Sequence, residues 1–259
     1  MKYFKFILFS VIVNLTAQAQ TNSGLTMFKP DSAEHAKQLM INKNNELATL
    51  EKYGQEINRK LPSLLEKFTL KKVENSQNGW YHHKTIDTLH SFIETPVSVK
   101  GHIYIKAHYV ADDYLTITKI RLKIANTSYE SMPLLKTSKY ITRRKTNKAH
   151  EYINLFAYVT EKEEEVRTMN ILAAIAHANE TAEIIIVFIG EQDNFEITLT
   201  KENVKAIRDS YYLSQYIAYK SNNFTPITMR IHSPQVNTPT TYLIPKSQYT
   251  VNDMKGVVD

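Results

Sequence analysis

The sequence predicts an α+β protein, in which a mainly antiparallel β-sheet or sandwich carries a long N-terminal helix and two further packed helices. Three patterns point to this class: a helical apolar stripe up to Phe68, alternating apolar and polar segments between residues 101 and 199, and two later segments of helical periodicity. The 259 residues are 42% apolar and 22% charged, which excludes a disordered or collagen-like chain. A chain of this length can bury a large core without disulfides.

The first twenty residues have the order of a bacterial Sec signal peptide. Lys2 and Lys5 form a positive start, an apolar run follows over residues 7–15, and Ala17-Gln18-Ala19 is a small-residue cleavage site. The run is too short to span a bilayer, which needs about 20 residues, although a buried strand is an alternative interpretation. We therefore expect residues 1–19 to be removed on export to the periplasm, the cell surface or the medium, and we find no later apolar segment of membrane-spanning length.

The rest of the chain divides by composition into one domain and a short extension. Residues 20–220 show no repeat, low-complexity segment or linker, and we expect them to form a single α+β domain. Residues 221–259 contain four prolines and two candidate strands, 227–232 and 240–244. Because proline cannot donate a ladder hydrogen bond, these strands are expected at sheet edges.

A long helix is predicted over residues 31–68. Asp31 or Ser32 can cap its start, and apolar side chains then recur every three or four residues. We interpret the resulting stripe as a core face, with an intermolecular coiled coil as the alternative. Pro62 removes one backbone donor, so a kink or restart is expected there. The stripe consists of Leu47, Leu50, Gly54, Ile57, Leu61, Leu64 and Phe68.

Alternating segments predict the first strands. Asn78-Gly79 is typical of a hairpin turn, so a strand should begin directly after it. Residues 101–110 alternate apolar with polar side chains, and residues 114–124 do so with a change of phase part of the way along. We expect these two segments to form an antiparallel hairpin with one solvent-exposed face, and a β-bulge near Thr118 or Lys119 to produce the change of phase.

The second half of the domain alternates strands with helices. Residues 151–160 are predicted to form a strand rich in aromatic side chains. Residues 184–190 are apolar throughout, which predicts a central strand covered on both faces. An acidic start favours a helix over residues 166–179, with an apolar strand as the alternative. Thr200 can cap a last helix that runs to about Tyr219.

Several classes of chemistry are excluded by what the sequence lacks. Without cysteine there can be no disulfide, thiolate metal site, cysteine nucleophile or cysteine-linked lipid anchor. There is no GxSxG, P-loop, dinucleotide-binding or HExxH motif. The adjacent His82 and His83 should point to opposite faces of a strand. His102 and His108 lie about 20 Å apart along another strand, too far to share one ion. We therefore expect neither a cofactor nor a metal.

Two groups of side chains are candidate binding surfaces. Six cations form a candidate patch for an anionic ligand such as phosphate, an acidic polysaccharide or a lipid headgroup, although a solvated loop is the alternative interpretation. They are Arg143, Arg144, Lys145 and Lys148 from the acid-free segment 132–149, with Arg121 and Lys123 from the strand before it. A candidate recognition face follows the polar side of strand 101–110, where plain surface histidines are the alternative: His102, Tyr104, Lys106 and His108.

On these grounds we expect an exported soluble protein without catalytic activity, which binds an envelope protein or an anionic polymer. A net charge of only +6 does not favour nucleic acid as a partner. Two other functions stay open: a secreted hydrolase that uses carboxylates and a histidine, and a subunit of a surface assembly. No motif of a known protein family is recognised in the chain.

Overall fold

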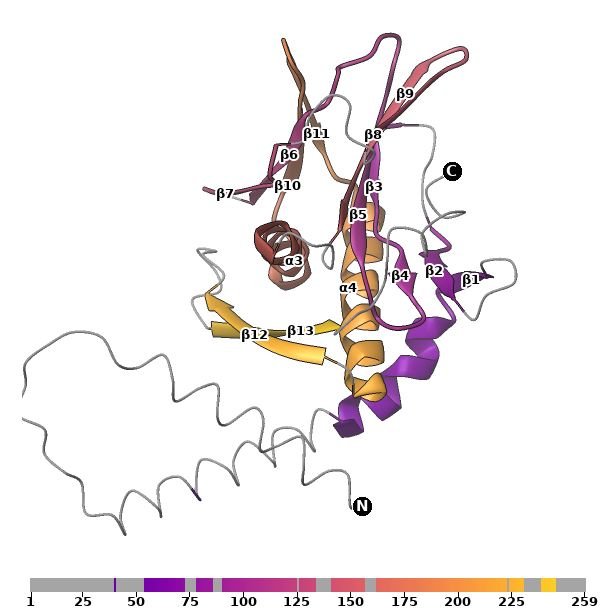
Figure 1. Cartoon of the computed structure of the whole chain (residues 1–259), viewed down its shortest axis with the longest axis vertical. Helices are drawn as coiled ribbons and strands as arrows, with labels where there is room; N and C mark the ends of the chain where they lie inside the picture. Colours follow the sequence, from indigo (N-terminus) through magenta and orange to yellow (C-terminus); the bar gives the residue numbers. More distant parts are fainter. Residues whose placement is uncertain are drawn as a thin grey trace, which may run out of the picture. The chain divides into compact units, whose positions relative to one another are not determined.

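The α+β class that the sequence predicts is confirmed: helices pack against antiparallel sheets (Figure 1). The computed structural model describes residues 40, 54–72, 78–85, 90–124, 126–133, 141–156, 162–222, 224–230 and 239–245. The predicted signal peptide, residues 1–19, and most of the first half of the predicted N-terminal helix lie outside these residues.

The described part of the N-terminal helix covers residues 54–65. The helix continues through Pro62 to residue 65, so the restart that the sequence offers as one outcome does not occur; Pro62 stands in the last turn, and its carbonyl accepts a hydrogen bond from the backbone N of Glu66 at 3.3 Å. Ile57 and Leu64 are buried in the core, so this part of the apolar stripe is a core face, as predicted.

Sheet A has the strand order β1-β2-β4, with β1 (Phe68–Lys72), β2 (Gly79–His83) and β4 (Val97–Ser98). β1 and β2 are antiparallel, and Lys72 lies opposite Gly79 in their register. Asn78-Gly79 therefore ends the connection between two paired strands, as the hairpin prediction requires. Trp80 on β2 is fully buried and packs edge-on against Tyr104, with 5.2 Å between ring centroids.

Sheet B has the order β3-β5-β9-β8, with β3 (Phe92–Glu94), β5 (Tyr104–Ala111), β9 (Ala149–Phe156) and β8 (Ile141–Lys145). The strand predicted over residues 101–110 is confirmed as β5. β8 and β9 are an antiparallel pair in which Ile141 lies opposite Ile153. The described part of the basic segment is therefore a strand followed by a tight turn, and its interpretation as an open loop is wrong.

Sheet C has the order β11-β10-β6-β7, with β11 (Asn194–Thr198), β10 (Ile184–Ile189), β6 (Lys119–Ile124) and β7 (Thr127–Glu130). β10 pairs with β6 on one side and β11 on the other, which confirms the predicted central strand. On β11, Phe195 and Ile197 are half-buried while Glu196 and Thr198 are exposed, so the predicted alternation is also confirmed.

The predicted hairpin of residues 101–110 and 114–124 is wrong. β5 pairs with β3 and β9 in sheet B, whereas β6 pairs with β7 and β10 in sheet C. The change of phase reflects a crossover between two sheets instead of a β-bulge. Residues 114–118 have no strand pairing, and Thr116 has a left-handed backbone with φ of 56°. Ile117, which follows it, is fully buried.

Two helices complete the core. α3 (Lys162–His177) confirms the predicted helix and contacts β6 and β7 of sheet C, β9 of sheet B, and α4 (Figure 1). α4 (Lys201–Ser221) begins at Thr200, whose side chain accepts a hydrogen bond from the backbone N of Asn203, as the predicted cap requires. α4 also contacts β3 and β4.

Gly101 marks a close approach between α4 and the chain before β5. Its φ is 89°, and a Cβ at this position would lie 2.8 Å from the backbone N of Ala218. The Ser214 hydroxyl donates to the Gly101 carbonyl at 2.6 Å. Only glycine fits both the left-handed backbone and the space beside the helix.

β12 (Phe224–Arg230) and β13 (Pro239–Pro245) form an antiparallel pair in the C-terminal segment, where the sequence predicts two short strands. Both strands contact α4. Among the described residues, no helix combines the length and the apolar character needed to cross a bilayer.

Candidate functional site

Sheet B carries one polar and aromatic face. In the register of β3 and β5, Phe92 lies opposite His108 and Glu94 lies opposite Lys106. In the register of β5 and β9, His108 lies opposite Tyr152. Because side chains alternate along a strand, these residues share one face, and Ile105 and its neighbours in the core share the other.

Sheet A covers part of this face, so the predicted solvent exposure is wrong. Trp80 lies against Tyr104, which is fully buried, and His82 on β2 reaches Glu94 on β3. His108 is also buried, while Lys106 is only half-buried, with its ammonium group 4.4 Å from the centre of the Tyr152 ring.

The polar centre of the face is a chain of four side chains, His82, Glu94, His108 and His150, which we call the Glu94 cluster. His82 Nδ1 lies 2.7 Å from Glu94 Oε1. His108 Nε2 lies 3.5 Å from Glu94 Oε2, and its Nδ1 lies 3.0 Å from His150 Nε2. The pairing of β3, β5 and β9 brings three of these residues together, and β2 adds the fourth.

The contacts determine where the protons lie. A carboxylate only accepts hydrogen bonds, so His82 must donate from Nδ1 to Glu94. His108 also carries its proton on Nε2, because the lone pair of an unprotonated Nε2 would face the negative carboxylate and be repelled by it. In neutral His108, Nδ1 is then an acceptor, and His150 donates to it from Nε2.

The pKa values favour this protonation pattern at neutral pH. Burial raises the pKa of Glu94, but the contacts with His108 and His82 outweigh burial and hold the pKa of the carboxyl well below its usual value. Burial lowers the pKa of His108, although Glu94 opposes the change. Burial and the charge of Lys106 lower the pKa of His150. The centre is therefore one carboxylate beside neutral His108 and His150.

His102, another residue of the predicted recognition face, lies outside the Glu94 cluster, as Tyr104 and Lys106 do. His102 lies before β5 begins and is buried, and its backbone N donates to the Ser98 hydroxyl at 2.9 Å. Burial, with a smaller effect of the Lys100 charge, lowers the pKa of His102 to about 3. His102 is therefore a neutral core residue at physiological pH.

The structure distributes the predicted cationic patch over two sheets and pairs most of it with acids. On β8, Arg143 binds the fully buried Glu151 at 2.6 Å, while Lys145 binds Asp113 at 3.0 Å. Arg144 on β8 and Lys148 in the following turn are exposed.

The other two cations of the patch lie on β6 in sheet C. Arg121 binds Glu130, and Lys123 binds Glu196 at 2.5 Å. Acids from other segments thus pair with four of the six predicted cations, Arg121, Lys123, Arg143 and Lys145, which sequence spacing alone does not show.

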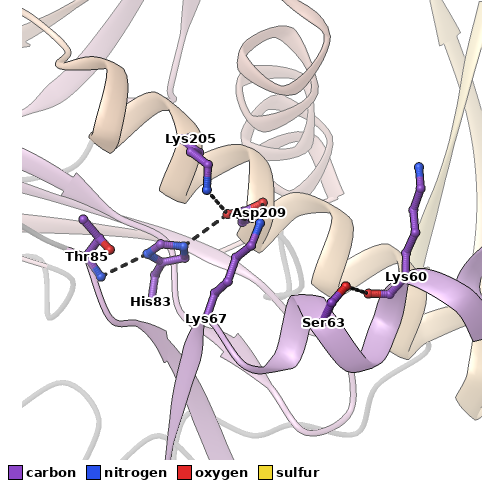
Figure 2. A network of polar contacts seen from close by, with 7 residues as sticks. All are labelled: Lys60, Ser63, Lys67, His83, Thr85, Lys205 and Asp209. Atoms are coloured by element: carbon purple, nitrogen blue, oxygen red, sulfur yellow. Dashed lines mark hydrogen bonds and ion pairs between the residues drawn. The ribbon is translucent and has the colours of Figure 1, made fainter.

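A second polar group, which the sequence analysis missed, surrounds Asp209 on α4 (Figure 2). We call Lys67, His83, Lys205 and Asp209 the Asp209 network. Lys67 Nζ lies 2.8 and 2.9 Å from the two carboxylate oxygens, and Lys205 Nζ lies 3.3 Å from Oδ2. The network ties β2 and the end of the N-terminal helix to α4.

His83 has a defined tautomer in this network. The backbone N of Thr85 donates to Nδ1 at 3.2 Å, so the other nitrogen, Nε2, carries the proton and donates to Asp209 at 3.3 Å (Figure 2). Burial raises the pKa of Asp209, but His83 and Lys67 outweigh it and lower the pKa to about 2. His82 and His83 serve different clusters, as the prediction of opposite faces requires.

A hollow lies beside the edge strands of sheets B and C and the start of α4, and we call it the edge cavity. It measures about 560 Å³. His90, Lys148 and Glu202 provide charged or polar groups around it. Phe92 stacks on His108 at 4.1 Å and thus separates the cavity from the Glu94 cluster. The apolar lining consists of Phe92, Val110, Phe195, Ile197 and Leu199.

No metal centre is found: within the described segments, no three His, Asp or Glu side chains are arranged to hold an ion. Comparison with protein-family models, with curated proteins and with solved structures found no match.

Proposed function

We propose that the chain is an exported, non-catalytic binding protein that holds a small amphipathic ligand in the edge cavity. The observation that carries this proposal is the cavity itself, whose volume of about 560 Å³ lies within the range of small-molecule sites. Its apolar wall is combined with few polar groups, the usual composition of such a site.

The lining indicates the class of ligand. Phe92, Phe195 and Leu199 offer an apolar surface for an aromatic or aliphatic body. The polar side chains of Ser91 and Asn203 are already engaged with backbone groups, so they add little affinity for a ligand. A polar end of the ligand would therefore meet the exposed groups around the cavity, including the Lys148 ammonium.

Binding of anilinonaphthalene sulfonate, an apolar dye with one anionic group, tests the proposal. Ile197→Trp would fill the cavity, and we expect it to weaken dye binding at least tenfold. Glu196→Trp is the matched control, because it adds the same ring one residue away on β11, where the side chain is exposed and pairs with Lys123. Equal binding by both variants would contradict the proposal, whereas a misfolded variant would bind more dye.

Export is part of the proposal and has its own test. Intact-mass measurement of the protein from a bacterial periplasmic or extracellular fraction should find a chain that begins at Gln20. Support comes from the order of charged, apolar and small residues before that position. A chain found in the cytosol with Met1 at its start would refute export without affecting the dye experiment.

A hydrolase is the second candidate, and the Glu94 cluster favours it. Glu94 orients His82 through Nδ1, so neutral His82 would have Nε2 available as a base, the role that a carboxylate and histidine pair has in acid–base catalysis. Hydrolysis of p-nitrophenyl acetate well above the rate of free imidazole, with loss in folded His82→Gln, would support it. A rate equal to that of imidazole would exclude this reaction for the site.

A further inference from the structure

A second hollow lies between the N-terminal helix and α4, away from the edge cavity. It measures about 310 Å³, and we call it the tyrosine cavity. The residues that matter are Lys60, Ser63 and Lys67 on one side and Asp209, Tyr212 and Tyr216 on the other. Figure 2 shows the first three and Asp209 from close by.

The charges of the tyrosine cavity are paired. Lys67 binds Asp209 at 2.8 Å, and Lys60 binds Glu56, which also lines the cavity, at 2.5 Å. Because two cations and two anions line the cavity, the lining has no net charge. Its electrostatic potential therefore attracts neither an anionic nor a cationic ligand strongly. The pairing also restrains the charged groups as hydrogen-bond donors and acceptors, and such charge-assisted bonds are stronger than neutral ones.

The two tyrosines provide a second kind of surface. Tyr212 and Tyr216 are one turn apart on α4, with ring centroids 6.2 Å apart and a tilt of 35° between the rings. Burial raises the pKa of Tyr216, so its hydroxyl stays protonated at neutral pH. Tyrosine combines an apolar ring face with a polar hydroxyl, which suits a ligand that has both kinds of surface.

From this combination we infer that the tyrosine cavity binds a neutral polyhydroxylated ligand, a carbohydrate. The C–H faces of a sugar ring are apolar and can lie on a tyrosine ring, while its hydroxyls both donate and accept hydrogen bonds. Lys60 and Lys67 can donate to such groups, while Asp209 and the Ser63 hydroxyl, which itself donates to the Lys60 carbonyl at 3.0 Å, can accept from them. A phosphate or sulfate would instead meet the carboxylates of Glu56 and Asp209.

A glycan array with neutral, sulfated and sialylated glycans, followed by titration calorimetry of the best ligand, tests this inference. We expect neutral glycans to be retained, and Tyr212→Ala to weaken binding at least tenfold. Tyr114→Ala is the matched control, since Tyr114 is 39% exposed and does not line the cavity. Should Tyr212→Ala fail to fold, Ser63→Trp on the exposed helix surface fills the cavity and should abolish binding.

The outcomes separate this inference from the proposed function. Ile197→Trp in the edge cavity should leave glycan binding unchanged, so each site can fail without the other. Retention of no glycan, retention of only acidic glycans, or equal affinity in Tyr212→Ala and the parent protein would each overturn the inference.

Discussion

The Glu94 cluster and the Asp209 network hold a carboxylate in different ways. Glu94 contacts the histidines His82 and His108, while Asp209 contacts two lysines as well as His83. Burial raises the pKa of both carboxyls, and in both cases the partners outweigh burial and lower it. The two sites therefore reach the same ionised state by different means.

The two sites therefore differ in how they respond to pH. Lysine keeps its charge far above neutral pH, so the contacts of Lys67 and Lys205 with Asp209 persist until the carboxyl itself takes up a proton. Within the Glu94 cluster, the partners of the carboxylate include no such permanent cation, because burial keeps His108 neutral at neutral pH. We make five predictions about these two sites and about other buried or exposed charged groups, in order of decreasing expected effect.

The largest effect should come from His102, a buried histidine outside both clusters. The pKa of His102 is about 3 in the folded chain and 6.5 in the reference state, so the unfolded chain binds a proton first on acidification. Below pH 6.5, this histidine should lower the free energy of unfolding by about 1.4 kcal/mol per pH unit. The total loss should reach at most about 5 kcal/mol near pH 3. Urea unfolding at several pH values should show a shallower slope in His102→Gln; an unchanged slope would contradict this.

Glu151 extends the comparison to a carboxylate that is fully buried and paired with a permanent cation. It binds Arg143 and accepts a hydrogen bond from the backbone N of Ile117. Glu151→Ala should lower the free energy of unfolding by about 3 kcal/mol, because the half-buried Arg143 loses its ion pair and the buried backbone N of Ile117 loses its acceptor. Glu151→Gln retains an acceptor for Ile117 and should lose less. Equal losses would show that the contact with Ile117 matters little.

Glu94→Gln breaks the histidine site. The amide has one acceptor oxygen and no charge, so the carboxylate that His82 bonds and that His108 Nε2 faces at 3.5 Å would be lost. We expect a loss of about 2 kcal/mol in the free energy of unfolding at pH 7.5, measured by urea denaturation. A loss below about 0.5 kcal/mol would mean that water replaces the carboxylate without cost.

Asp209→Asn breaks the lysine site. The pKa of Asp209 is lowered from 3.8 to about 2, so its ionised form stabilises the fold above pH 4, and this contribution is lost as pH falls toward 2. The variant should lose about 2 kcal/mol at neutral pH. It should also lose the part of the acid transition below pH 4. An identical acid transition in parent and variant would refute this assignment.

Local sequence patterns predicted which helices and strands form better than they predicted which strands pair with one another. The central strand β10, the helix α3 and the Thr200 cap each follow from residues close together in the chain. The pairing of β5 and β6 was predicted wrongly because alternation fixes the faces of a strand and says nothing about its partner. The phase change was visible near Thr118, but a crossover between sheets and a β-bulge produce the same local signal.

The Glu94 cluster and the Asp209 network were harder to predict from the sequence than the strands. His108 and His150 are 42 positions apart, and only the pairing of β5 with β9 brings them together. Glu94 lies on a strand of three residues, too short for an alternating pattern. Asp209 lies on the side of α4 that faces His83, which is 126 positions earlier in the chain. In each case the missing information is the long-range contact.

The smallest effect is expected where the carboxylate is exposed. Lys123 and Glu196 lie 2.5 Å apart across sheet C, but 34% and 50% of their side-chain surfaces are accessible to water. Because water and salt screen such a pair, Lys123→Ala should change the free energy of unfolding by less than about 1 kcal/mol, and still less in 1 M salt. A loss as large as that of Asp209→Asn would show that burial does not separate the strong carboxylate sites from the weak ones.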